Sequence, residues 1–223
     1  MRGETMHFEV LVEDQSGAIV VEAILQKIFA ATAPAPTYRI HSYKGIGRLP
    51  KNLRGQIDPQ KRILLDRLPK ILRGYGRSLL TSDAVLVVID LDDRDCLQLK
   101  LELVSLLEQC HPRPNTLFRI AIEEIEAWLL ADLLALKKAY PRAKDSALNT
   151  YVQDSICGTW EKMADAIYPG GSVKLKALGY PLIGEIKSEW AKNISPQIKI
   201  NNNYSKSFQV FCSGVRRLAG IAI

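Results

Sequence analysis

Acidic residues follow three apolar segments of the chain, and their chemistry is suited to binding a divalent cation. Glu13 follows the run FEVLV, Asp90 follows AVLVVI, and Glu123 follows FRIAI. The complete set is Glu13, Asp90, Asp92, Asp93, Asp95, Glu123, Glu124 and Glu126. Carboxylate oxygens are hard ligands, which suit Mg²⁺ or Mn²⁺. The pattern therefore predicts a divalent-metal site, provided that the fold brings these acids together.

The elements that must position these acids alternate between strand and helix. The segments with strand patterns are 7–12, 37–42, 84–89 and 117–122. Apolar periodicity predicts helices over 18–29, 60–73 and 95–109, and a further helix that opens at residue 123. Such alternation produces right-handed crossovers and a mainly parallel sheet, whose strands all end at one edge. We therefore expect a Rossmann-like α/β fold, flanked by helices, that collects the acids at that edge.

The pattern becomes irregular beyond residue 140. Helices are predicted over 159–167, 183–193 and 205–218, without an internal repeat. We expect residues 1–140 to form the α/β core and residues 141–223 to form a mostly helical extension that packs on it.

The acids are expected to repel one another at neutral pH unless a cation lies among them. In an extended D-x-D segment, Asp90 and Asp92 would point to the same side and could share one ion or bracket two. Glu13, Asp90 and Asp92 are therefore the predicted metal ligands.

The other acids have equally good structural interpretations. Asp93 or Asp95 would serve as a helix N-cap, and Glu123 and Glu124 suit a first helical turn. Glu126 is the fourth catalytic candidate: on a helix that opens at Glu123, these two side chains share a face, and one of them could complete the metal shell. The alternative is a buried Glu126 that is hydrogen-bonded to the turn after the first strand.

Basic residues are concentrated between residues 44 and 77, in a chain with a net charge of +6. The loop in this segment follows the second strand, so it should emerge beside the acidic edge. Clustered Lys and Arg bind a nucleic-acid backbone by releasing counterions, whereas the alternative is a solvated helix face. The predicted nucleic-acid contacts are Lys44, Arg48, Lys51 and Arg54. KGIGRLPKNLRG lacks the Lys-Ser/Thr ending of a P-loop, which argues against nucleotide hydrolysis.

Composition bounds the compartment and the partners. No apolar run is long enough for a signal peptide or a membrane span, and the four cysteines lack CxxC spacing. We expect a cytoplasmic protein with reduced thiols and no membrane partner.

The motifs together resemble a known family. A glutamate that ends the first strand and a D-x-D that ends a later one resemble the TOPRIM pattern of topoisomerases, primases and the overcoming-lysogenization-defect nucleases. RIAIEEIEAWLLAD, a K-x-x-W-A stretch from Lys187 to Ala191 and S-K-S-F from Ser205 to Phe208 resemble a TOPRIM-like family of bacterial defence clusters, domain of unknown function 4276. Its genes often neighbour ATPase genes.

The resemblance implies metal-dependent cleavage of nucleic acid, DNA in preference to RNA, together with a partner ATPase. Glu13 would act as a general acid or base or as a ligand, while Asp90 and Asp92 would hold Mg²⁺ or Mn²⁺ against a phosphodiester. One departure is Asp14, where the family usually has glycine. The alternative is a catalytically silent subunit of the same fold that binds nucleic acid or an ATPase.

Overall fold

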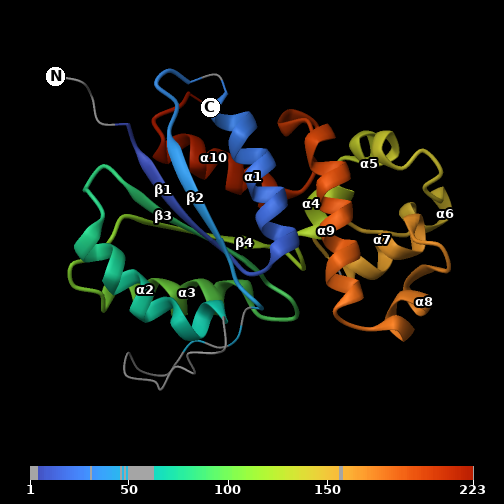
Figure 1. The fold of residues 1–223 in the computed structure, drawn as a ribbon, viewed down its shortest axis with the longest axis horizontal. Coiled ribbons are helices and arrows are strands. Elements are labelled where there is room, and N and C mark those ends of the chain that lie inside the picture. Colours follow the sequence, from blue (N-terminus) through green and yellow to red (C-terminus); the bar gives the residue numbers. More distant parts are fainter. Residues whose placement is uncertain are drawn as a thin grey trace.

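A four-stranded parallel sheet organises the computed structural model, which describes residues 5–30, 32–45, 47, 49, 63–155 and 158–222. The strands are β1 (His7–Val12), β2 (Thr37–Ser42), β3 (Ala84–Asp90) and β4 (Thr116–Ala121). They are ordered β2-β1-β3-β4, and each neighbouring pair is parallel. The expected Rossmann-like α/β fold is confirmed (Figure 1).

Strand β3, one of the two inner strands, is buried along its whole length. Its sequence AVLVVID consists mainly of β-branched and other apolar residues, which suit a strand that is covered on both faces. In the register of the sheet, Val12 of β1 lies beside Val88, and Asp90 lies beside Ala121 of β4. The carboxyl ends of these three strands are therefore level.

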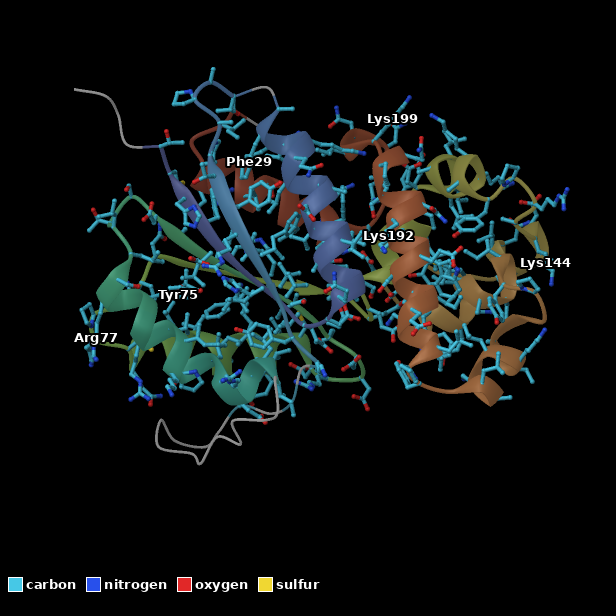
Figure 2. The ribbon with its side chains drawn as sticks, viewed as in Figure 1. Phe29, Tyr75, Arg77, Lys144, Lys192 and Lys199 are labelled. Carbon is cyan, nitrogen blue, oxygen red and sulfur yellow. The ribbon has the colours of Figure 1, made fainter. Side chains whose placement is uncertain are left out.

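Helices cover both faces of the sheet. Helices α1 (Gln15–Phe29) and α10 (Lys206–Leu218) contribute to the apolar cluster on one face, with Phe8 and Val10 of β1. Helices α2 (Leu64–Ser78) and α3 (Cys96–Glu108) contribute to the cluster on the other face, with Leu11. Figure 2 shows Phe29 at the first of these layers and Tyr75 at the second.

A group of helices lies beside the sheet (Figure 1). They are α4 (Glu126–Leu130), α5 (Leu133–Ala139), α6 (Asp145–Leu148), α7 (Thr159–Ile167), α8 (Gly171–Leu178) and α9 (Leu182–Ile194), followed by the 3-10 turns Ser195–Gln197 and Ile200–Asn202. The side chains of Trp128, Trp160 and Trp190 lie in the same apolar cluster as Phe8 of the sheet. Trp128 also donates a hydrogen bond from Nε1 to Ser207 Oγ at 2.8 Å.

Two predicted helices differ from those observed. The long helix expected from residue 123 divides into α4 and α5, because the carboxylate of Asp132 caps a new helix by accepting a hydrogen bond from the backbone N–H of Ala135. The helix expected over 60–73 instead spans Leu64–Ser78. It continues through Gly76, where a Cβ would lie 1.9 Å from the carbonyl oxygen of Pro112, so glycine permits this close approach.

The helices in the described ranges are all too short or too polar to cross a membrane.

Candidate acidic site at the carboxyl ends of the strands

Glu13 and Asp90 lie where the order of the sheet reverses. From β1 the chain passes to β2 on one side, whereas β3 lies on the other side of β1, which makes the gap between β1 and β3 the topological switch point. Ligands of open α/β sheets bind outside the carboxyl ends of the strands at such a point. Glu13 follows β1, Asp90 ends β3, and Glu13 Oε2 accepts a hydrogen bond from the backbone N–H of Asp90 at 3.1 Å.

Burial and mutual repulsion make ionisation of these two carboxyls costly. Burial raises the pKa of Glu13 to about 7, with contributions from the charges of Asp92 and Asp14, while the hydrogen bond from Asp90 opposes the rise. Burial and the charge of Glu13 raise the pKa of Asp90 well above its ordinary value. A cation between these groups would relieve both effects.

Asp92 does not continue the strand, so the prediction of an extended D-x-D segment is wrong. The strand β3 ends at Asp90, and Asp92 adopts a left-handed conformation with φ of 52°. The cause is a long-range contact: the backbone N–H of Asp92 donates to the carbonyl of Glu123 at 2.9 Å. This turn sets the direction of the Asp92 side chain, whose charge still contributes to the raised pKa of Glu13.

Glu126 lies deeper, against a lysine from the distant helix α9. Lys187 Nζ forms an ion pair with Glu126 Oε2 at 3.2 Å, and the two side chains are 9% and 1% exposed. Ser16 Oγ, in the first turn of α1, lies 3.3 Å from Glu126 Oε1 and 2.9 Å from Asp14 Oδ2, so these two acceptors share its single hydroxyl proton. Burial raises the pKa of Glu126 and the charge of Lys187 opposes the rise. Glu126 is thus buried, as its structural alternative expected, but its partners are Lys187 and Ser16 of α1 and not the turn after β1.

Lys187 holds its charge because several acids surround it. Burial lowers the pKa of its ammonium, but the charges of Glu126, Glu124 and Asp14 outweigh burial and raise that pKa well above the ordinary value. A single ammonium cannot neutralise these acids together with Glu13 and Asp90. Lys187 therefore divides the cluster into a neutralised inner part at Glu126 and an outer pair, Glu13 and Asp90.

The residues after β4 connect the acidic edge to the C-terminal segment. Glu123 has a left-handed backbone with φ of 65°, so the helix does not open there as predicted, but begins at Glu126. The buried carboxylate of Glu123 accepts hydrogen bonds from Tyr151 Oη at 3.1 Å and Thr159 Oγ1 at 2.5 Å. Glu124 accepts a hydrogen bond from the backbone N–H of Trp160 at 3.0 Å.

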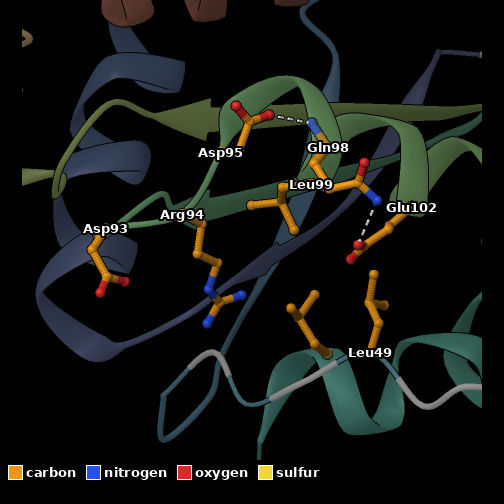
Figure 3. Close-up of a pocket in the computed structure, with 8 residues that line it drawn as sticks. Leu49, Asp93, Arg94, Asp95, Gln98, Leu99 and Glu102 are labelled. Atoms are coloured by element: carbon orange, nitrogen blue, oxygen red, sulfur yellow. Dashed lines mark hydrogen bonds between the residues drawn. The ribbon is translucent and has the colours of Figure 1, made fainter.

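Two of the other aspartates cap helices. The carboxylate of Asp14 accepts hydrogen bonds from the backbone N–H of Gly17 at 2.7 Å and from Ser16 Oγ at 2.9 Å, which makes it the N-cap of α1. Asp95 caps α3 by accepting from the N–H of Gln98 at 2.6 Å, whereas Asp93 is exposed. Figure 3 shows Asp93 and Asp95 beside a cavity of about 500 Å³ between α2 and α3. Glu13, Asp90 and Glu126 are not among the residues that line this cavity.

Of the four predicted nucleic-acid contacts in the basic loop, Lys44 is the one that lies within the described residues. Its side chain is exposed, and the next residue, Gly45, donates its backbone N–H to the carbonyl of Glu13 at 3.1 Å. Lys44 therefore lies at the acidic rim, where the sequence predicts a nucleic-acid contact. The other predicted contacts, Arg48, Lys51 and Arg54, lie outside the described residues.

The chemistry of the outer pair fits a magnesium or manganese ion. In the described part of the chain, no three His, Cys, Asp or Glu side chains are grouped closely enough to hold a metal ion. Magnesium, however, keeps several of its waters and is often bound through one or two carboxylates together with substrate phosphates. Glu13 and Asp90 suit that mode. Asp92 as a third ligand stays a prediction.

The raised pKa values predict how stability depends on pH in metal-free buffer. Glu13 and Glu124 each have a pKa of about 7 in the folded chain instead of 4.5, chiefly because they are buried. The folded state therefore binds protons more tightly than the unfolded state, so these groups lower the free energy of unfolding as pH rises from about 4.5 to about 7. Denaturant unfolding across this range should show a steeper decline for the wild-type chain than for a Glu13→Gln, Glu124→Gln variant. Equal slopes would contradict the assignment.

The sequence motifs assigned no role to Lys187, although it belongs to the site. The sequence nevertheless contains an indication of its role: Lys187 lies three residues before Trp190, which places a charge on the buried side of an amphipathic helix. A lysine on such a face requires a buried anion as a partner.

Comparison with known protein families gives a match that covers the whole candidate site. Neither a curated protein nor a solved structure matches the chain. The family described as a domain of unknown function, DUF4276, matches residues 12–216, from the end of β1 into α10. The matched region contains Glu13, Asp90, Glu126 and Lys187 and covers most of the chain, which therefore belongs to the DUF4276 family.

Proposed function

We propose that the outer pair, Glu13 and Asp90, binds Mg²⁺ or Mn²⁺ and that the protein cleaves phosphodiester bonds of nucleic acid. The observation that supports this proposal most directly is the placement of two hydrogen-bonded acids at the switch point of the sheet. The charge of Glu13 also raises the pKa of Asp90, and a cation between the two carboxylates would relieve this repulsion. A site that combines hard ligands with a demand for positive charge suits a divalent ion next to a phosphate.

Each acid of the site has a different task in this proposal. Bound Mg²⁺ or Mn²⁺ would supply an activated water and stabilise charge on the phosphate. Asp90 is a ligand, and Glu13 is a ligand or a general acid or base. Asp92, on the turn after β3, would have to turn toward the ion to serve as the predicted third ligand, because no three acids of the described residues are grouped closely enough in the metal-free chain. Glu126 is held by Lys187 and supports the site from beneath.

The proposed substrate is nucleic acid, DNA in preference to RNA. Lys44 at the rim supports a contact with the phosphate backbone, to which Arg48, Lys51 and Arg54 of the same loop would add. We further propose that the protein is related to TOPRIM enzymes and to the overcoming-lysogenization-defect nucleases. It would act in bacterial defence, with a partner ATPase, in the cytoplasm.

The experiment is a cleavage assay with the purified chain. The protein is incubated with Mg²⁺ or Mn²⁺ and with plasmid, linear duplex, single-stranded DNA or RNA, while EDTA serves as the metal-free control. We expect cleavage of DNA that EDTA abolishes. Cleavage that persists in EDTA would contradict the metal dependence. An inactive chain that also shows no heat of Mn²⁺ binding by calorimetry would contradict the metal site itself.

A second candidate function is a binding subunit without catalysis. Two observations favour it: Asp14 is occupied in capping α1, and Glu126 is already paired with Lys187. This candidate predicts salt-dependent association with nucleic acid but no turnover. Metal-dependent cleavage by the isolated chain, lost on replacement of Asp90, would eliminate it.

A further inference from the structure

Helix α3 presents a stripe of large apolar side chains to solvent. Leu97 is 73% exposed, Leu101 is 65% exposed and Val104 is 38% exposed. Their spacing of four and three residues places them on one face of the helix. Single exposed apolar residues are ordinary, but a continuous stripe along a helix is typical of a surface that another helix covers.

The packing of α3 on the sheet does not account for this stripe. The side chains that α3 buries are Leu99, Leu103 and Leu106, which belong to the cluster beneath the helix with Val85 and Val87 of β3. Leu101 and Val104 point away from that cluster. The helix is therefore apolar on two opposite sides, of which the fold uses one.

The charges beside the stripe make this face complementary to the same face of a second, antiparallel copy. Lys100 and Glu108 are both exposed, and each lies four residues, about 6 Å along the helix, from Val104. If two copies of α3 pack antiparallel about a two-fold axis at Val104, Lys100 of each copy lies beside Glu108 of the other. The same axis places Leu101 beside the half-buried Leu107. An interface of this kind uses one surface twice.

We propose that the outward face of α3, formed by Leu97, Lys100, Leu101, Val104 and Glu108, binds a second copy of this chain in an antiparallel, two-fold arrangement. The charge pattern favours this occupant, because it matches an identical helix in reverse orientation. The proposal is independent of the proposed catalytic function, since the face lies on the outside of α3 and contains none of the acids of the site.

The first test measures the mass of the full chain by analytical ultracentrifugation over a series of concentrations. We expect a dimer for the wild type. Leu101→Glu should raise the dissociation constant by about 100-fold or more, because each copy loses the burial of a leucine. The matched control is Leu134→Glu on α5, where the leucine is 73% exposed outside this face, and this variant should remain dimeric. A monomeric wild type, or equal effects of the two variants, would overturn the proposal.

The second test uses the charges. Lys100→Glu and Glu108→Lys should each weaken the dimer, whereas the double variant should restore it, because the exchanged charges again face each other across the axis. Circular dichroism establishes that each variant is folded. A double variant that is weaker than both single variants would overturn the antiparallel arrangement.

Discussion

Lys187→Met is expected to lower the free energy of unfolding by about 3–5 kcal/mol at neutral pH, which is the usual effect of removing one partner from a buried ion pair. The methionine retains most of the apolar volume, so the loss arises from Glu126, whose carboxylate stays 1% exposed without its cation. Glu124 and Asp90 also lose a compensating charge. Denaturant unfolding monitored by circular dichroism measures the change.

The pH dependence separates this electrostatic effect from simple packing. The carboxyls around Lys187 have raised pKa values, so protons neutralise them as pH falls, and the cost of the missing ammonium should be smaller at about pH 5 than at about pH 8. The matched control is Lys176→Met, which removes an ion pair with Glu161 whose lysine is 55% exposed and should cost less than about 1 kcal/mol. An equal loss in both variants, or a loss that does not change with pH, would contradict the role of Lys187.

Asp90→Asn is expected to reduce metal-dependent cleavage by about 1000-fold or more. Metal-ion catalysis supplies several kcal/mol of transition-state stabilisation, and each 1.4 kcal/mol or so corresponds to a factor of ten in rate. The amide cannot provide the negative charge that holds the ion. In the wild type, added Mn²⁺ should also raise the melting temperature, because an ion bound at the proposed site would stabilise the folded chain and relieve repulsion between Asp90 and Glu13. The variant should lose this stabilisation.

The control for Asp90→Asn is Asp93→Asn. Asp93 lies on the same connection, and its replacement makes the same change in net charge, but its side chain is exposed. This variant should retain both cleavage and the response to Mn²⁺. A stabilisation by Mn²⁺ that survives in Asp90→Asn would move the ion away from the switch point, whereas loss of both properties in Asp93→Asn would show a general effect of charge.

The positions of Glu13 and Asp90 at the ends of strands could be predicted, because a strand is recognised from a few consecutive residues. A β-branched run such as AVLVVI indicates a buried strand, and alternation with helices indicates a parallel sheet, whose strands end at one edge. Capping by Asp95 was open to prediction for the same reason, since an N-cap bonds to a residue only three positions along the chain.

The turn at Asp92 and the ion pair at Glu126 could not be predicted in this way. The conformation of Asp92 depends on a hydrogen bond to the carbonyl of Glu123, in the connection after β4, and the residues around Asp92 give no reason to expect a left-handed backbone. The partner of Glu126 comes from α9, and only the packing of that helix against α1 and α4 brings Lys187 to the acids.

The sequence by itself thus determined which elements form, the parallel sheet and the edge at which its acids collect, because apolar periodicity and caps act over a few residues. The tertiary structure decided which acids face one another and which of them pairs with Lys187. The physical reason is that the free energy of a charge depends on its burial and on its neighbours in space, and neither is a property of neighbouring positions in the chain.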